Sequence, residues 1–414
     1  MSSVSPSPAP ASSEAPLTSR FVTHEVENQP VALRDYNVWE GDTALREAVE
    51  REGARWAADH LEEYGALAGG RLAELGYTAN ENKPKLRSFD RYGRRIDEVE
   101  FHPAYHELMA EAMKYGMNGF AWRNANRAGA HVARAAVMYV GSQADAGVGC
   151  PMSMTHAAIP ALRHNPALAE KWVPKLISTE YDPRSVPMEQ KKGCTIGMGM
   201  TEKQGGSDVR ANTTRAIRQA DGSYELVGHK WFFSAPMCDA HLVLAQAQGG
   251  LSCFLVPRFR PDGSRNAVEI QRLKDKLGDW SNASSEVEFQ GAFGELVGEE
   301  GRGVATIIEM VALTRLDCMT GSASQMRQAL VQALHHAGQR MAFGKLLIDQ
   351  PLMRNVLADL ALESEAAIAL TLRVARAIDG ASRDAHEAAL GRIATAIGKY
   401  WICKRTPPFV NEAQ

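Results

Sequence analysis

The most informative stretch of the sequence is Met198-Gly199-Met200-Thr201-Glu202-Lys203-Gln204-Gly205-Gly206-Ser207-Asp208. A strand pattern runs here into a glycine pair that has hydroxyl side chains on both sides. Glycine lets backbone N–H groups approach an anion closely, and the hydroxyls of Thr201 and Ser207 can bond carbonyl or phosphate oxygens. Taken alone, a simple β-turn explains the pattern better. The spacing fits neither a Walker loop nor G-x-G-x-x-G, and no βαβ unit surrounds it, which argues against a Rossmann site.

A second element is the strand-like stretch Gly228-His229-Lys230-Trp231-Phe232-Phe233-Ser234. Its aromatic faces can line a planar ring, and a serine hydroxyl can reach a ring heteroatom. Strand aromatics most often pack in the core, which is the alternative here. Because side chains alternate along a strand, Phe232 and Ser234 should share one face and Phe233 the other.

A third element is Arg340-x-x-Phe343-Gly344, followed by Gln350, between two long helical patterns. In isolation a helix end explains it: Gly344 would terminate the helix, and Arg340 would favour the negative end of its dipole.

The surrounding patterns predict an α+β fold with helices, then strands, then helices. Residues 1–20 are rich in Ser, Pro and Ala and are predicted to be a disordered tail. Residues 21–193 are predicted to be all-helical after that tail, with a cap at Asp42. Residues 194–295 contain short apolar runs separated by Gly, Asp and Pro, which predict a compact antiparallel β domain. Residues 296–414 return to helical periodicity and predict a bundle. The predicted helices cover residues 101–114, 119–140, 159–177, 304–334 and 352–378. The predicted strands cover residues 194–200, 223–227, 240–247, 251–257, 267–273 and 286–289.

Composition excludes several classes of protein. The 414 residues include 46 Lys plus Arg and 49 Asp plus Glu, a net charge of -3, which argues against a protein built mainly to coat nucleic acid. No apolar run reaches the roughly 18 residues that a membrane-spanning helix requires. The 6 cysteines are scattered without a C-x-x-C motif, which is typical of reduced thiols in a cytoplasmic protein and predicts no metal site.

Together the three elements resemble the acyl-CoA dehydrogenase flavoprotein superfamily. Within it the chain is similar to the AidB-like branch, which belongs to the adaptive response to DNA alkylation. The resemblance spans residues 21–414 and rests on Gly197–Val209, Asn212–Ala216, Leu226–Ser234, Leu273–Gly278 and Gln350–Arg354. It implies a helical domain, a β domain and a helical bundle.

The resemblance also implies non-covalently bound FAD. The strand and turn would contact the flavin and its phosphates, Phe232 and Ser234 would back the isoalloxazine ring, and the third element would reach the adenosine end of FAD in a neighbouring subunit. The site is thereby shared, which implies a homo-oligomer, a dimer or a tetramer. The cofactor-binding residues implied are Met198, Gly199, Met200, Thr201, Glu202, Lys203, Gln204, Gly205, Gly206, Ser207, Phe232, Phe233, Ser234, Arg340, Phe343 and Gln350.

The sequence departs from the usual family pattern at the catalytic positions. The more usual members carry Pro at the position of Lys203 and Trp at that of Phe232. The family removes an α-proton from an acyl-CoA thioester with a carboxylate while hydride leaves from the β-carbon. In isovaleryl-type members this Glu precedes an Arg, where this chain has Thr314-Arg315, and in other members it falls beyond Gln414. We therefore expect no catalytic residue in this chain.

The end of the sequence leads to a further expectation. Pro407–Gln414 predicts the start of another bundle helix that lacks a cap. We expect a C-terminally truncated chain with an incomplete bundle, without the basic C-terminal domain that the resemblance assigns to DNA contact.

The sequence thus predicts a FAD-binding, AidB-like flavoprotein linked to protection from alkylation damage, with weak or no acyl-CoA oxidation. One alternative is a working acyl-CoA dehydrogenase, an oxidoreductase acting on CH–CH donors, that binds an acyl-CoA ligand in lipid or amino-acid catabolism. Another is a DNA-binding protein that uses the flavin fold as a scaffold. Its only local basic cluster is Arg87–Arg95, and the acidic residues that follow favour a solvated loop.

Overall fold

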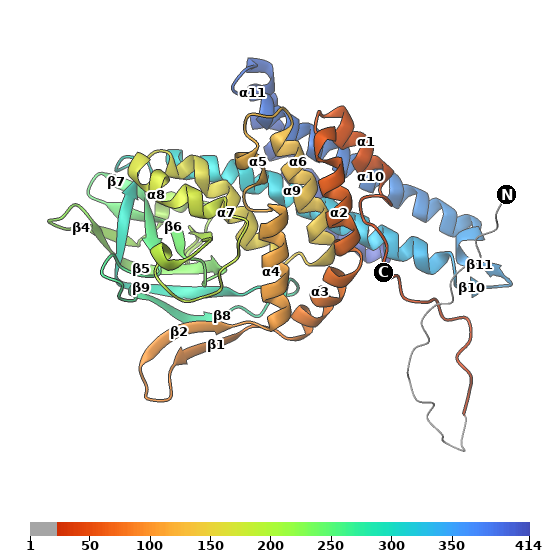
Figure 1. Ribbon diagram of the computed structural model, residues 1–414, viewed down its shortest axis with the longest axis horizontal. Coiled ribbons are helices and arrows are strands. Elements are labelled where there is room, and N and C mark those ends of the chain that lie inside the picture. Colours follow the sequence, from red (N-terminus) through yellow and green to blue (C-terminus); the bar gives the residue numbers. More distant parts are fainter. Residues whose placement is uncertain (1–22) are drawn as a thin grey trace.

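The computed structural model describes residues 23–414 (Figure 1). The predicted order of helices, strands and helices is confirmed, and with it the α+β class. The predicted tail, residues 1–20, lies outside the described residues. In Figure 1 the β domain forms the left end of the molecule, and long helices run from it to a small hairpin at the right.

The N-terminal helices surround α6 and α7, which are buried almost all round because most of their residues, on every face, are apolar or small. As predicted, Asp42 caps the first helix, its Oδ1 accepting a 3.0 Å hydrogen bond from the Leu45 N–H. Two predicted helices are wrong in extent. The helix predicted over residues 119–140 is interrupted between residues 124 and 129. The helix predicted over residues 159–177 is divided where Asn165 caps a new helix that starts with Pro166. The helices are α1 (Thr43–Arg51), α2 (Ala58–Ala68), α3 (Arg71–Glu81), α4 (Pro103–Tyr115), α5 (Phe120–Arg123), α6 (Ala130–Ala144), α7 (Gly149–Leu162) and α8 (Pro166–Leu176).

The Arg-rich stretch forms a β-hairpin, so the predictions of a loop and of an all-helical N-terminal region are wrong here. Strands β1 (Lys85–Phe89) and β2 (Arg95–Glu100) pair antiparallel, with Leu86 opposite Val99. These two apolar side chains pack against the β-domain core, which fixes a register that the arginines obscure in the sequence. Two of the arginines have carboxylate partners, Arg87 with Glu100 and Arg95 with Asp97.

The middle strands close into a barrel. The pairing order is β3-β6-β4-β5-β9-β7, and β6 also pairs with β7, while β8 adds to β9. The expectation of a purely antiparallel domain is wrong, because β3 runs parallel to β6. The long segment between these two strands supplies the connection that a parallel pair requires. The strands are β3 (Ile196–Gly199), β4 (Arg215–Arg218), β5 (Tyr224–Ser234), β6 (Ala240–Ala247), β7 (Gly250–Pro257), β8 (Val268–Leu273) and β9 (Ser284–Val297).

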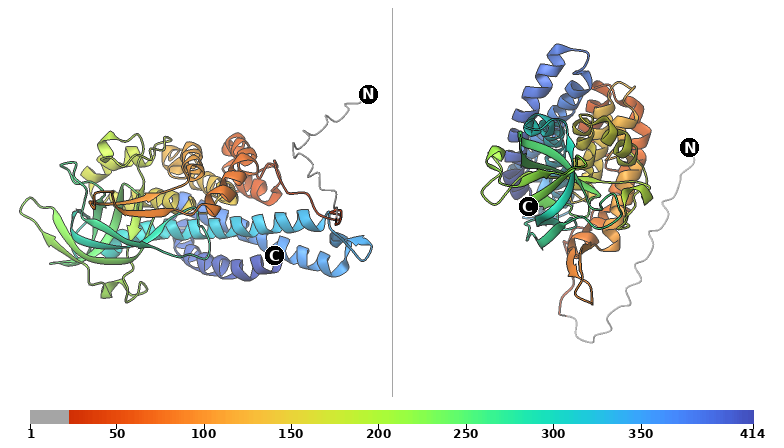
Figure 2. Two further views of the ribbon diagram at one scale, coloured as in Figure 1. Left: turned by 90° about the horizontal axis from the view of Figure 1, so that it is seen from below. Right: turned by 90° about the vertical axis from the view of Figure 1, so that its left-hand side faces the viewer.

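The C-terminal region consists of α9 (Gly303–Ala337), α10 (Pro351–Gly380) and α11 (Ala385–Ala413), which lie side by side in Figure 2. The predicted new helix at Pro407 is wrong: these residues continue α11, and the buried Phe409 anchors them to the bundle. Gly344 does not end a helix either. It lies in the turn between β10 (Met341–Ala342) and β11 (Lys345–Leu346), where Phe343 and Gly344 both have positive φ, as a two-residue hairpin turn requires.

Helix α9 joins the cores of the molecule. Ile307, Met310 and Leu313 pack with α7, β3 and β6, while Leu316 and Met319 pack with α6 and α10. A cavity lies along this helix, where the two cores meet. Within residues 23–414, no helix combines the length and the apolar character needed to cross a bilayer.

Candidate functional site

A cavity of about 510 Å³ lies between the ends of β3 and β5 and the helices α6, α7, α9 and α11. It brings together two of the three predicted elements, which lie more than thirty residues apart in the sequence. The predicted site residues that line it are Met198, Met200, Thr201, Phe232 and Ser234.

The turn after β3 is tight and rests on backbone contacts. Glu202 and Gly205 exchange N–H···O=C bonds of 3.3 and 3.0 Å, and the Trp231 N–H donates to the Thr201 carbonyl at 2.8 Å. Gly205 has a φ of +140°, and a Cβ on Gly206 would lie 2.4 Å from Thr201 Oγ1. Only glycine leaves the backbone open at these two positions, which suits close approach of a ligand.

Beneath the turn lies a buried ion pair between Glu202 and Lys230, at 2.8 Å, with both side chains fully buried. The Glu202 carboxylate accepts further hydrogen bonds from the N–H groups of Thr213 and Thr214, from the Thr213 hydroxyl and from the Gln204 amide. Burial alone would raise the pKa of Glu202, but the bonds from Lys230, Thr213 and Thr214 outweigh it and hold the pKa well below its ordinary value. Glu202 therefore fixes the turn and does not line the cavity.

The other predicted residues of the turn also lie outside the cavity lining. Lys203, Gln204, Gly205 and Ser207 are exposed, and Gly206 is half-buried. The Gln204 side chain is directed back to Glu202 and to the Ala211 carbonyl. What these positions offer to a ligand is chiefly backbone, close in the chain to the lining residue Thr201.

The end of β5 presents two faces, and the predicted alternation is confirmed. Phe232, 52% exposed, and Ser234 line the cavity, whereas Phe233 is buried and stacks on His241 with ring centroids 3.7 Å apart. A Cβ on Gly199 would meet the Phe233 ring at 2.8 Å, so this glycine serves that packing. Burial lowers the pKa of His241 to about 3, so the stacked ring is neutral.

The helical wall contributes polar residues that sequence reasoning did not include in the site. Arg134, Met138 and Ser142 recur every four residues on α6, and Thr314, Asp317 and Gly321 recur every three or four on α9. All of these except Arg134 line the cavity. Asp317 Oδ1 accepts a hydrogen bond from Arg134 Nη1 in a second buried ion pair. The helical periodicity could have indicated that Asp317 shares a face with Thr314.

The third predicted element lies far from this cavity within one chain. Arg340, Phe343 and Gln350 surround the β10–β11 hairpin, at the end of α9 opposite the β domain (Figure 1). The Phe343 side chain is 98% exposed. Arg340 donates to the Asn28 carbonyl and Gln350 to the Ala342 carbonyl. One chain therefore cannot bring these residues to a ligand in the cavity.

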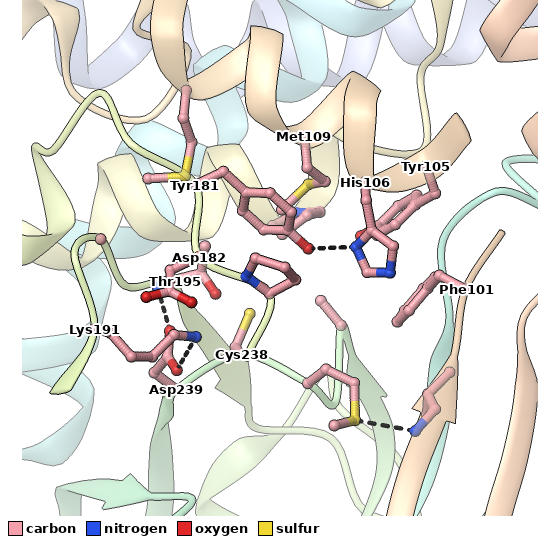
Figure 3. Close-up of a pocket in the computed structure, with 17 residues that line it drawn as sticks. Phe101, Tyr105, His106, Met109, Tyr181, Asp182, Lys191, Thr195, Cys238 and Asp239 are labelled. Atoms are coloured by element: carbon pink, nitrogen blue, oxygen red, sulfur yellow. Dashed lines mark hydrogen bonds and ion pairs between the residues drawn. The ribbon is translucent and has the colours of Figure 1, made fainter. Parts of the chain in front are cut away.

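A second, much smaller cavity of about 70 Å³ lies between α4 and the β domain (Figure 3). Tyr181 and His106 share a hydrogen bond of 2.9 Å across it, and Lys191 pairs with Asp239 at 2.7 Å. Burial raises the pKa of Cys238 to about 12, so this thiol stays protonated. None of the predicted site residues lines this cavity, and its polar groups already pair with one another.

The sequence matches known protein families along most of its length. Residues 28–183 match the family described as adaptive response protein AidB N-terminal domain. Residues 197–292 match the acyl-CoA dehydrogenase middle domain, and residues 301–413 match the acyl-CoA dehydrogenase C-terminal domain.

Two curated relatives are similar over nearly the whole chain. AidB of Escherichia coli strain K12 is 53% identical over 393 residues, which cover 94% of this chain and 72% of that protein. Acyl-CoA dehydrogenase family member 11 of Caenorhabditis elegans is 30% identical over 388 residues, which cover 90% of this chain and 62% of that protein. The chain is thus shorter than either relative.

Solved structures share the fold. Caenorhabditis elegans ACDH-11 in complex with C11-CoA superposes with a TM-score of 0.86 and 26% identity, covering 95% of this chain and 69% of that chain. Butyryl-CoA dehydrogenase from Megasphaera elsdenii superposes with a TM-score of 0.62 at 19% identity, covering 89% of this chain and 88% of that chain. The second likeness concerns the fold alone.

Proposed function

The chain belongs to the acyl-CoA dehydrogenase family, in its AidB-like branch, and on this premise we propose that it binds FAD in the cavity at the ends of β3 and β5. The observation that carries the proposal is the meeting of Met198, Met200 and Thr201 with Phe232 and Ser234 in one cavity. Two separate segments thereby offer backbone, hydroxyl and aromatic surface to one planar ligand.

The residues present fit a flavin. The Gly205-Gly206 backbone is open enough to approach phosphate oxygens, and the exposed Phe232 ring offers a flat face beside the Ser234 hydroxyl. When bound, FAD supplies the capacity to accept hydride. The contribution of the chain is to orient the ring and to exclude water from one side of it.

We propose that acyl-CoA oxidation is weak or absent. Proton abstraction requires a free carboxylate at the flavin. Thr314 lines the cavity where an isovaleryl-type base would stand, and its hydroxyl donates to the Val311 carbonyl at 3.1 Å. Asp317 also lines the cavity, but its side chain is only 2% exposed and one of its carboxylate oxygens is engaged by Arg134. A dehydrogenase that uses Asp317 as its base is the second candidate function.

The third predicted element supports a shared site in a homo-oligomer. Arg340, Phe343 and Gln350 are remote from the cavity of their own chain, and Phe343 exposes almost its whole ring. We propose that they reach the adenosine end of FAD bound to a neighbouring copy. A Phe343→Ser variant should then lose FAD while its unfolding temperature without FAD stays unchanged.

The biological role proposed is protection from DNA alkylation damage, and its support is the match of residues 28–183 to the adaptive response protein AidB N-terminal domain. An acyl-CoA-like ligand is proposed because ACDH-11 was solved in complex with C11-CoA. Basic residues such as Arg87 and Arg95 are paired with carboxylates, which lends the DNA-scaffold alternative no specific support.

The decisive experiment records the visible spectrum and the solution mass of the purified chain with FAD added. A flavin absorbance that co-elutes with the protein, and that butyryl-CoA does not bleach under anaerobic conditions, is the expected result. A folded chain that retains no flavin would refute FAD binding, and rapid bleaching would favour the dehydrogenase with Asp317 as base.

A glycine substitution provides the structural test. Gly206→Ala should weaken FAD binding, because the new Cβ would lie 2.4 Å from Thr201 Oγ1 and displace the turn. Gly278→Ala is the matched control, since nothing lies within 4 Å of a Cβ at that exposed loop position. Equal FAD affinity of the two variants would contradict a role for the turn.

A further inference from the structure

We infer that Asn28 is a positioning residue for the FAD site that two copies of the chain share. It holds the β10–β11 hairpin, and with it Arg340 and Phe343, in the place from which they reach a neighbouring copy. The inference rests on the proposed function, because it names the group that orients residues of that site. Residues 28–31, the N-terminal strap, make five polar contacts with the end of α9 and the hairpin.

The Asn28 side chain pairs with the backbone of β10. Its Nδ2 donates to the Met341 carbonyl at 2.8 Å, and its Oδ1 accepts from the Met341 N–H, also at 2.8 Å. A side-chain amide offers the same donor and acceptor as a peptide unit, so Asn28 takes the place of a further strand beside β10. A two-stranded hairpin is marginal on its own in water, which makes such a partner important.

The backbone of Asn28 fixes the Arg340 side chain. Asn28 has a φ of +53°, in the left-handed region that asparagine tolerates better than most residues. In this conformation its carbonyl accepts a 2.6 Å hydrogen bond from Arg340 Nη1. In the described part of the chain Arg340 has no carboxylate partner, so its charge stays available to a phosphate oxygen of the cofactor.

Two further contacts tie the strap to the end of α9. The Val31 N–H donates to Gln339 Oε1 at 3.1 Å, and His335 Nε2 lies 2.8 Å from the Val31 carbonyl oxygen. Pro30 lies between the two anchored residues of the strap, and its ring fixes its own φ and restricts the residue before it. The strap is therefore short and stiff, which suits it to set the position of the hairpin.

The hairpin has little apolar contact that could set its position instead. Phe343 is 98% exposed and Met341 is 48% exposed. Gln350 also bonds to β10, through the carbonyl of its second residue. The hydrogen bonds from Asn28 and Gln350 thus decide where the hairpin lies, and Asn28 does so from outside the implied set of cofactor-binding residues.

The test separates the two ends of the cofactor. FAD and FMN share the flavin ring, and only FAD carries adenosine. The full chain, freed of flavin, is titrated with each, and flavin fluorescence reports the affinity. Asn28→Gly keeps the left-handed backbone and removes the side-chain bonds, so it should bind FAD about tenfold more weakly and FMN as the unchanged protein does. Asn28→Asp keeps the acceptor for the Met341 N–H and should restore part of the FAD affinity.

Asn82→Gly is the matched control. Asn82 is also exposed, and its Nδ2 donates to the Thr78 carbonyl at 2.9 Å at the end of α3, away from the hairpin. This variant should leave both affinities unchanged. The solution mass of all the variants should equal that of the unchanged protein.

Equal FAD affinity of Asn28→Gly and the unchanged protein would overturn the inference and leave the proposed function intact. An equal loss of FAD and FMN affinity would also overturn it, because Asn28 would then act on the whole fold. A loss of FAD that accompanies dissociation into monomers would do the same, since the strap would then act on assembly. If the unchanged protein is a monomer, or binds FAD no more tightly than FMN, the proposed shared site fails and this inference fails with it.

Discussion

Two buried ion pairs flank the cavity, and they differ in how completely their polar atoms are paired. Glu202 meets Lys230 and accepts four further hydrogen bonds, so both oxygens of its carboxylate are used. Asp317 meets Arg134 through one oxygen and leaves the other without a partner. The first pair lies beneath the glycine turn, and the second faces the cavity from the helical wall.

The difference separates a fully paired buried charge from one that is paired through a single oxygen. A buried charge with all its bonds made rigidifies the segment that makes them, here Glu202 to Thr214. A buried charge with an unused oxygen carries a desolvation penalty that its remaining bond offsets only in part. The comparison therefore predicts that disrupting the Glu202 pair costs more stability than weakening the single bond between Arg134 and Asp317.

The largest expected effect is on stability at the Glu202 pair. Glu202→Ala leaves the Lys230 amine buried without its carboxylate partner, and it also removes the acceptor for Thr213 and Thr214. Such a loss destabilises a protein by about 3–5 kcal/mol. Urea unfolding followed by circular dichroism measures it.

A surface pair provides the reference for that measurement. Lys192 and Glu180 also lie 2.7 Å apart, but their side chains are 68% and 61% exposed. Glu180→Gln should change stability by less than about 1 kcal/mol, as exposed pairs usually do. A comparable loss in the two variants would contradict the structural role of Glu202.

A smaller effect is expected at the second pair. In Asp317→Asn the amide oxygen can still accept the bond from Arg134, so the cost is that of a weakened charged hydrogen bond, about 1–3 kcal/mol. The same unfolding experiment measures it. A loss larger than that of Glu202→Ala would invert the comparison.

Mild acid should lower the free energy of unfolding through His131, a partly buried neighbour of Arg134. Burial, and to a smaller extent the charge of Arg134, lowers the pKa of His131 from 6.5 to about 4. Below pH 6.5 the unfolded chain therefore binds a proton that the folded chain does not, and stability falls as the pH falls towards 4. Between pH 6.5 and 5.5, His131→Gln should remove less than about 1.4 kcal/mol of this dependence.

The measurement is urea unfolding at several pH values. An identical dependence in His131→Gln and in the unchanged protein would show that His131 contributes nothing.

Sequence patterns predicted the fold well where local signals agree with packing. The three-part order, the family and the AidB-like branch are confirmed, and so is the division of Phe232 and Ser234 from Phe233 along β5. The β1–β2 hairpin was not predicted, because its register depends on Leu86 and Val99 packing against a distant core. The parallel β3–β6 pair was also missed, since strand direction is set by tertiary connections.

The lining of the candidate cavity could be predicted only where one local segment carries it. The strand before the turn and the end of β5 were singled out because each has a dense run of characteristic residues. Asp317 and Ser142 were not predicted as lining residues, because each is a single polar residue on a helix and its place depends on α6 and α9 facing the same cavity. Glu202 was predicted as a cofactor-binding residue because it belongs to the turn. Its side chain instead bonds to partners inside the protein, such as Lys230.

The smallest expected effect tests the comparison most directly. The predicted change in the free energy of unfolding has opposite signs for alanine substitutions of two buried serines, Ser324 and Ser142. Ser324→Ala removes a hydroxyl that donates to the Tyr139 carbonyl, so it should destabilise the protein by about 1 kcal/mol. Ser142→Ala removes a buried hydroxyl that has no partner, so it should leave stability unchanged or raise it by up to about 1 kcal/mol. Thermal unfolding of the two variants without ligand measures both. Equal destabilisation would mean that Ser142 has a partner in the folded protein, and the contrast between the two serines would then disappear.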